Sequence, residues 1–510
     1  MTQPPDSSAP LVGAEARRAA RNAGAIAAAR LISSAALFGW QLVLARMLGD
    51  ADFGVYSTIS ALFTIGATLA AFGMGMMVIR DVARRPERAG DYLTVTLVAQ
   101  TLLALGAYAG INGAASALGY SEAIRAFTAL AGLSLFADTL GNMAYDQLLA
   151  QERMVTTSII ETAHVLIRIA LALLMLALGF GLLGVYAATI VSGFGRAAVL
   201  WRVLWRSGVR PRFPLDRPLT RLLLINSAPL ALSAFINITY TQIDRLMTTS
   251  LLTEADTGHL GAAFVIVYGV IELLSTTILV AIFPMMSRAY AGGEESGSRP
   301  VFRFLVDKLS FFTLLAGLCL ALIFTLFAAD ITVPLFGEDF RPSADVLRVL
   351  IWYCAATMVV NVFAQAMMVQ NRQRQFLVIR TGGLIGKLAL NLLLLPLIGV
   401  IGAAFASLTA ELLVLLVVGA RFGAGETLLQ PGRLLRLGLA SALTLLAMYA
   451  VGLLHPFLGI AAGIVVYPLS VLGLRVLAGD DLDLLYRLIA AMPGGRVILR
   501  FWRRDVALNW

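Results

Sequence analysis

The sequence predicts an all-α protein that crosses a membrane many times, and two of its features carry this prediction. Hydrophobic residues make up 59% of the 510 residues and charged residues only 14%, which leaves too few polar side chains to cover a soluble globule. The apolar residues also form about fourteen long segments. At about 1.5 Å per helical residue, such segments are long enough to cross the roughly 30 Å hydrocarbon core of a bilayer.

The first apolar segment follows a polar, Pro- and Ser-rich and then basic stretch, residues 1–21, which we expect to be a disordered cytoplasmic tail. Residues 23–48 are too long for the apolar core of a signal peptide, so a retained span is predicted there. The later spans are predicted at residues 53–79, 92–118, 123–149, 155–178, 181–205, 222–250, 258–286, 304–329, 345–369, 374–396, 398–420, 433–454 and 457–478.

The short connections between spans alternate in charge, and this alternation predicts the orientation. Connections such as 80–91, 202–221 and 371–374 are basic, whereas 49–52 and 253–258 are mainly acidic or neutral. The positive-inside rule places the basic set in the cytoplasm, together with both termini. Membrane topology thus accounts for the net charge of +9, and no nucleic-acid partner is predicted.

The two halves of the chain align with each other. Residues 167–174 (IRIALALL) match residues 386–393 (GKLALNLL), and this match aligns Arg168 with Lys387, 219 residues further on. The next helix continues the match. Parallel repeats of this kind are typical of transporters, in which the site lies near the membrane midplane between two lobes.

The repeat predicts two six-helix lobes in the same membrane orientation, followed by two further helices. Within the lobes, residues 51–56 (ADFGVY) and 255–260 (ADTGHL) occupy equivalent places. The predicted parts are an N-terminal lobe at 22–205, a basic cytoplasmic linker at 206–221, a C-terminal lobe at 222–420, two helices within 433–478 and a cytoplasmic tail at 479–510. The tail at 479–510 carries leucines at helical spacing, which predicts an interfacial amphipathic helix. The alternative is an ordinary cytoplasmic tail.

Several basic residues lie deep inside predicted spans. Arg168 and Lys387 each follow the cytoplasmic end of their span by about thirteen residues, about 20 Å along a helix and too deep for easy snorkelling. The predicted group of substrate-binding cations is Arg30, Arg168, Arg380 and Lys387. As a group they predict a hydrated, electropositive cavity and an anionic substrate. Alternatively, each cation pairs with a buried acid such as Asp138, Glu161, Glu272 or Glu411 and only holds helices together.

Further polar residues in the spans are candidates for a coupling or polar network. Glu161 and His164 share a helical face with Arg168. Asp244 either binds a coupling cation or pairs with an arginine of the other lobe. The full set is Asp138, Glu161, His164, Asn237, Asp244, Arg245, Glu272 and Asn391.

No constellation of an enzyme is present in the sequence. There is no P-loop, the three histidines lack metal-ligand spacing, and Cys319 and Cys354 lie in apolar segments as core residues. We therefore expect no catalytic residues, no metal site and no cofactor apart from a coupling ion.

Five segments taken together resemble the Wzx-type polysaccharide flippases of the multidrug/oligosaccharidyl-lipid/polysaccharide exporter (MOP) superfamily. They are ARMLGDADFGVYSTISAL (45–62), QLLAQERM (147–154), TYTQIDRLMTTSLLTEADTGHLGAAFVIVYGVIELLSTTILVAIFPMMSR (239–288), LFGEDFRPSADVLRVL (335–350) and GVIGAAFASLTAEL (399–412). The resemblance implies a MATE-like fold that alternates between inward-open and outward-open states in the bacterial inner membrane. It would move an undecaprenyl-pyrophosphate-linked oligosaccharide to the periplasmic leaflet for O-antigen, capsule or exopolysaccharide synthesis, driven by a gradient of H⁺ or Na⁺. Its partners would be this lipid-linked substrate, membrane lipids and the polysaccharide polymerase and export machinery.

Two other functions compete with the flippase. A drug/cation antiporter of the same superfamily would be expected to have acidic residues in its cavity and about twelve helices, whereas this sequence has deep cations and about fourteen. A membrane polysaccharide polymerase or ligase would usually carry a large periplasmic loop with arginines or histidines, and no such loop is present.

Reporter fusions test the orientation that the loop charges predict. A fusion at Gly208 should report a cytoplasmic location, and fusions at Glu254 and Gly337 a periplasmic one. Paired alkaline phosphatase and fluorescent-protein reporters measure this directly. A periplasmic signal at Gly208 would overturn both the orientation and the number of spans.

Overall fold

The computed structural model describes residues 9–291, 299–422, 431–477 and 481. The described residues form helices and no strands. Thirteen helical segments among them are long and apolar enough to cross a membrane, so the protein is a multi-pass membrane protein. Most of the predicted tail at 479–510 lies outside the described residues.

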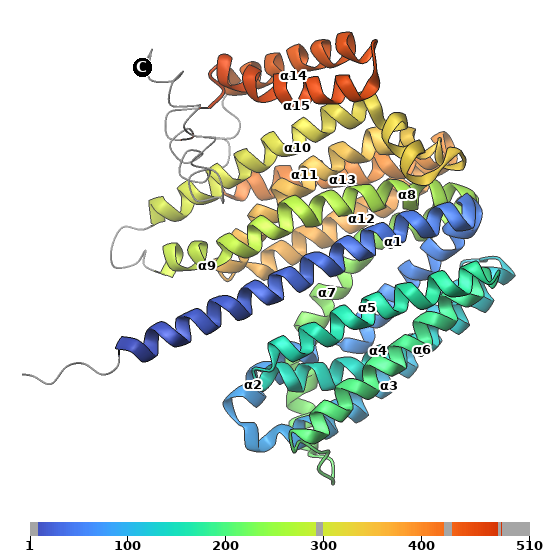
Figure 1. Ribbon diagram of the computed structural model, residues 1–510, viewed down its shortest axis with the longest axis vertical. Helices are drawn as coiled ribbons and strands as arrows, with labels where there is room; N and C mark the ends of the chain where they lie inside the picture. The colour runs from blue at the N-terminus through green and yellow to red at the C-terminus, as the bar shows by residue number, and fades with distance from the viewer. Residues whose placement is uncertain (1–8, 292–298, 423–430, 478–480, 482–510) are drawn as a thin grey trace, which may run out of the picture. The chain divides into compact units, whose positions relative to one another are not determined.

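The helices follow one another along the whole described chain (Figure 1). The first eight are α1 Ala9–Ala71, α2 Met74–Arg84, α3 Ala89–Ala117, α4 Glu122–Ala150, α5 Met154–Ala177, α6 Gly181–Arg206, α7 Arg217–Leu251 and α8 Glu254–Val270. The others are α9 Thr277–Ala291, α10 Arg299–Phe336, α11 Ser343–Val369, α12 Gln373–Ile398, α13 Val400–Phe422, α14 Pro431–Gly452 and α15 Pro456–Gly473. A short π-helix, Ile271–Thr276, joins α8 to α9.

Helix α1 contains the span predicted at 23–48 and most of the span predicted at 53–79, which continues into α2. Gly49 has a φ of 77° and a ψ of 178°, so the helical backbone is broken at this residue. A side chain would be strained at this positive φ, which is why glycine suits the position. The candidate span Ile32–Arg84 has 53 residues, or ~80 Å of helix against roughly 30 Å of hydrocarbon. It is therefore long enough for two crossings, which reconciles thirteen segments with the predicted count of about fourteen.

The beginning of α1 differs from the expectation for the N-terminal tail. The helix begins at Ala9, within the stretch 1–21 that we expected to be disordered. Residues 14–30 are rich in alanine and arginine, two of the best helix formers, so local propensity favours extension of the first span toward the N-terminus.

The described chain packs into two compact units. Unit 1 comprises Met1–Ile266, Thr332–Val346 and Arg380–Ser407, and unit 2 comprises Val267–Ile331, Leu347–Ile379 and Leu408–Trp510. Unit 1 thus combines the first half of the chain with two segments of the second half, 332–346 and 380–407. These segments adjoin connections that we predicted on the outer side of the membrane. The division into two repeat lobes at 22–205 and 222–420 stays a prediction.

Helices α3 to α6 lie side by side in unit 1 (Figure 1). An apolar core forms where α1, α3 and α4 meet, with Ile59, Ile111 and Leu135 buried in it. Helix α7 begins with the sequence Asp-Arg-Pro, in which Asp216 accepts a hydrogen bond from the backbone N–H of Leu219 at 2.9 Å. This is the side-chain cap that helix N-termini favour, with proline in the first turn.

Unit 2 has its own aromatic and aliphatic core, which includes Phe311, Phe327 and Phe363. Helices α14 and α15 form a hairpin, and the ring of Phe327 lies so close to Gly452 and Gly459 that any added Cβ would touch it. Close backbone approach through glycine is a common way for membrane helices to pack.

Candidate functional site

Helix α12 has its polar side chains on its buried face and its apolar side chains outward. Its buried residues are Arg380, Lys387, Asn391 and Leu395, at spacings of seven, four and four that place them on one face. Its exposed residues include Ile385, Leu392 and Leu397. In a bilayer this arrangement exposes hydrocarbon to lipid and turns the charges toward protein partners.

The central contact of this face is an ion pair between α12 and α7. The Lys387 Nζ lies 2.5 Å from the Asp244 Oδ2, and both side chains are fully buried. The same Nζ donates a hydrogen bond to the backbone carbonyl of Tyr240 at 2.9 Å. Since Tyr240 and Asp244 are one turn apart on α7, a single lysine engages two consecutive turns of that helix.

Two further donors complete the surroundings of the Asp244 carboxylate. Asn391 Nδ2 donates to Oδ1 at 2.9 Å, and Ser407 Oγ of α13 donates to Oδ2 at 2.7 Å. A buried charge is tolerated only when it is both paired and hydrogen-bonded. Lysine, asparagine and serine together meet this condition for Asp244.

The ring of Tyr240 adds contacts to both cations of α12. The Arg380 Cζ lies 3.8 Å from the ring centroid and the Lys387 Nζ 4.6 Å from it. Both distances are within the range of cation–π attraction. The residues Tyr240, Asp244, Arg380, Lys387, Asn391 and Ser407, all in unit 1, are called the Asp244 cluster below.

A second polar cluster lies among α4, α5 and α6 of the same unit. Arg196 Nε donates to Glu161 Oε1 at 2.7 Å, and its Nη2 donates to Asn142 Oδ1 at 2.9 Å. Gly141 leaves room for the guanidinium, since a Cβ there would lie 2.5 Å from Nη1. Arg196 is therefore fixed in place by an acid and an amide.

Arg168 and His164 complete this second cluster but are held differently. His164 and Asp138 each lie within electrostatic reach of both Arg168 and Arg196. Arg168 makes no ion pair or hydrogen bond with any residue whose side chain the structure describes. Likewise, His164 Nε2 is buried without a hydrogen-bond partner among them. The residues Asp138, Asn142, Glu161, His164, Arg168 and Arg196 are called the Arg196 cluster below.

The structure thus divides the predicted cations between two clusters. Arg380 and Lys387 belong to the Asp244 cluster, and Arg168 belongs to the Arg196 cluster. The side chain of Arg30 lies outside the described residues. Asp244, which we expected to bind a cation or an arginine of the other lobe, pairs with a lysine of its own half.

The other predicted network residues are not members of either cluster. Asn237 is exposed on α7, and Glu272 is exposed in the π-helix. The Arg245 guanidinium lies 5.1 Å from the ring centroid of Phe264. Ser407, Tyr240 and Asn142 were not among the predicted site residues. The spacing of four between Tyr240 and Asp244 was the one sequence signal that pointed to any of them.

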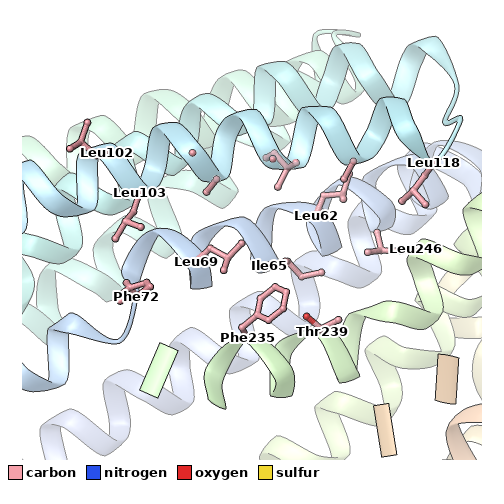
Figure 2. A pocket seen from close by; sticks show the side chains of 15 residues that line it. Leu62, Ile65, Leu69, Phe72, Leu102, Leu103, Leu118, Phe235, Thr239 and Leu246 are labelled. Carbon is pink, nitrogen blue, oxygen red and sulfur yellow. The ribbon is translucent and has the colours of Figure 1, made fainter. Parts of the chain in front are cut away.

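An apolar cavity of about 610 Å³ lies between α1, α3 and α7 in unit 1. Figure 2 shows Phe235 and Thr239 of α7 across from Ile65 and Leu69 of α1. Thr239 supplies the one polar side chain among its lining residues. This lining suits hydrocarbon and offers nothing to a sugar or a phosphate.

Comparison with known proteins places the chain in a family. The profile of the family described as "Polysaccharide biosynthesis protein" matches residues 43–345, more than half of the chain. The chain belongs to this family. The resemblance of its sequence to polysaccharide flippases is thereby confirmed. No curated protein matches the chain.

Solved structures of MOP transporters share the fold of this family member. The lipid II flippase MurJ in an inward closed conformation has a TM-score of 0.70 and 13% identity, over 88% of this chain and 98% of MurJ. An inward-facing MATE family multidrug transporter has a TM-score of 0.62 and 14% identity, over 77% of this chain and 95% of its own. A MOP superfamily transporter from Pyrococcus furiosus has a TM-score of 0.51 and 16% identity, over 78% of this chain and 96% of its own. The predicted all-helical MOP fold is confirmed.

A double-mutant cycle tests the buried pair of the Asp244 cluster. Asp244→Asn or Lys387→Met alone leaves one charge buried without its partner, which should cost about 3–5 kcal/mol of stability. The double variant removes both charges and should recover most of this loss. Thermal unfolding of the protein in detergent measures the effect.

The exposed pair Glu338–Arg341, with an N–O distance of 2.9 Å, provides the control. Glu338→Gln should change stability by less than about 1 kcal/mol because surface pairs contribute little. If the two single variants of the Asp244 cluster and the double variant lose stability additively, the pair is not the linked unit described here.

Proposed function

We propose that the protein is a flippase that moves an undecaprenyl-pyrophosphate-linked oligosaccharide across the bacterial inner membrane by alternating access. Membership of a polysaccharide biosynthesis family and the fold shared with a lipid II flippase support this proposal. The chemical argument for this proposal depends on Arg168. This arginine lies in the middle of α5 and makes no ion pair with a described residue.

The position of Arg168 argues for an anionic ligand. It follows the first residue of α5, Met154, by fourteen positions, or ~21 Å of helix. A guanidinium at that depth is costly without a counter-charge or water. Its planar fork of donors matches the oxygens of a phosphate group. A diphosphate head group would supply the charge that the protein itself does not pair with Arg168.

The neighbours of Arg168 prepare this position. Glu161 and Asn142 hold Arg196 in a fixed orientation, and Glu161 balances the charge of this second guanidinium. His164 Nε2 has no partner among the described residues and lies on the same helical face. Lys387 is likewise neutralised, by Asp244, so it contributes no net charge to a ligand in this conformation.

The hydrocarbon part of such a substrate finds a different environment. The apolar cavity between α1, α3 and α7 accepts hydrocarbon and excludes charge. A substrate with an anionic head and a long lipid tail needs both kinds of surface in one protein. We infer a secondary transporter and not an enzyme, with both termini in the cytoplasm as the loop charges predict. The coupling ion, H⁺ or Na⁺, and the partner proteins are proposals from the family resemblance alone.

Substitution of Arg168 tests the proposed ligand contact. Arg168→Ala should lower export at least tenfold, because a hydrogen bond to a charged group contributes about 1.5–3 kcal/mol. Arg168→Lys should retain part of the activity, since a point charge remains but the fork of donors is lost. The measurement is surface polysaccharide per unit of membrane-inserted protein.

Arg125, an exposed arginine in the first turn of α4, is the matched control. Arg125→Ala should leave export unchanged. If Arg168→Ala instead lowers the amount of protein in the membrane and leaves export per molecule intact, Arg168 has a structural role and the anion contact is refuted.

Transport in proteoliposomes tests the substrate class. The purified protein should move a fluorescent pyrophosphate-linked oligosaccharide lipid and not the same lipid without its diphosphate. Movement of a cationic dye in exchange for ions, with no movement of the lipid, would establish the antiporter function instead.

A further inference from the structure

The two outer connections that the repeat makes equivalent meet each other in unit 1. Residues 51–56 follow the helix break at Gly49, and residues 255–260 lie in the first turns of α8. A constant shift of 204 residues relates Asp50 to Glu254 and Gly54 to Gly258. These four residues form one contact, described next.

The contact between the two helices is reciprocal. A Cβ built on Gly54 would overlap the carbonyl oxygen of Glu254, and a Cβ built on Gly258 would overlap the carbonyl oxygen of Asp50. Gly54 therefore touches Glu254, and its repeat equivalent Gly258 touches Asp50. Asp50 and Glu254 are themselves equivalent in the repeat. Such an exchange of equivalent contacts is the property of a two-fold interface, so the pseudo-two-fold axis of the repeat passes between Gly54 and Gly258.

Small side chains continue this contact along both helices. A Cβ on Gly261 would lie 2.7 Å from Ser57 Oγ, which leaves no room for a larger residue. Beside the glycines, Thr58 Oγ1 lies 2.6 Å from Thr249 Oγ1, which in turn lies 2.9 Å from Thr257 Oγ1. Close backbone approach with hydroxyl bonds across the interface is how membrane helices seal against one another.

Weaker contacts surround this glycine contact at its rim. His259 Nε2 lies 3.2 Å from Asp50 Oδ2 and 3.1 Å from the backbone carbonyl of Asp339. Ser121 donates a hydrogen bond to Glu254 at 2.5 Å. The rings of Phe53 and Phe340 pack edge to face with centroids 5.8 Å apart. The Ser121–Glu254 bond is exposed and contributes at most about 1 kcal/mol. His259, Phe53 and Phe340 are buried, so these side chains close the rim of the contact against water.

We propose that the reciprocal Gly54–Gly258 contact is the outer gate of the transport path, that this structure has the gate closed, and that the gate opens when the two segments move apart on either side of the repeat axis. The proposal rests on alternating access as the transport mechanism. It adds the residues that form the seal and the axis about which they part.

Disulfide trapping tests whether the gate must open. Thr58→Cys with Thr249→Cys replaces two hydroxyls that already touch, in a background with Cys319 and Cys354 replaced by alanine. Oxidation in membranes should form the disulfide, which needs Cα atoms within about 7 Å. Export should then stop, and reductant should restore it.

The matched control joins two helices of the first half. Ser33 of α1 and Thr162 of α5 are hydrogen-bonded at 3.3 Å and do not border the gate. Ser33→Cys with Thr162→Cys should cross-link and leave export running. Failure of the 58–249 pair to cross-link, or export at full rate with that pair cross-linked, would each overturn the proposal.

A wedge at the glycine contact provides a second test that needs no transport assay. Gly54→Ala places a methyl group against the Glu254 carbonyl, so it should lower the rate of 58–249 cross-linking at least tenfold. Gly39→Ala on the same helix, where an added Cβ meets nothing within 4 Å, should leave the rate unchanged. Equal rates in both variants would refute the gate. Because cross-linking is read in the absence of substrate, this result is independent of which lipid the protein carries.

Discussion

The Lys387–Asp244 ion pair is the constraint on which the arrangement of α7, α12 and α13 depends. Neither charge is stable alone at membrane depth, so each fixes where the other helix must lie. Asn391 donates to the Oδ1 of this carboxylate, and Ser407 donates to its Oδ2. Replacing the pair with apolar residues would cost little stability in principle, which makes a specific orientation of α12 the better explanation for its presence. The inward polar face of α12 follows from that orientation.

At the equivalent repeat position, Arg168 makes no ion pair with a described residue, although Asp138 lies within electrostatic reach of it. The alignment pairs Arg168 with Lys387. In the structure, Asp244 neutralises Lys387, whereas Arg168 makes no ion pair with a described residue. Arg168 and Lys387 thus occupy equivalent positions in the two halves, but only the charge of Lys387 is balanced by an ion pair within the described residues. A transporter that binds one asymmetric substrate at its centre needs such a difference, because an exact two-fold site would present the same chemistry to the head group and to the sugar.

Much of the fold was predictable from the sequence, and much of the site was not. Long apolar segments predicted the spans because this signal is local and additive along the chain. The repeat directed attention to Lys387, but the choice of Asp244 as its partner depends on the rotation of α7 against α12. Ser407 and Asn142 carry no charge, and nothing in their local sequence distinguishes them from other small polar residues in spans. The reciprocal glycine contact was implicit in the match of residues 51–56 with 255–260, yet only three-dimensional packing shows that the equivalent segments touch.

The unequal neutralisation of the two repeat positions has an electrical consequence. The Lys387–Asp244 pair has no net charge, so it can move within the membrane without work against the transmembrane potential. Arg168 carries a whole charge, and displacement across the full field would involve about 2.3 kcal/mol per 100 mV. In the proposed function, a bound diphosphate would reverse the sign of that moving charge. The empty and loaded protein should therefore respond to membrane voltage in opposite directions, with the voltage sensor and the substrate contact residing in one side chain.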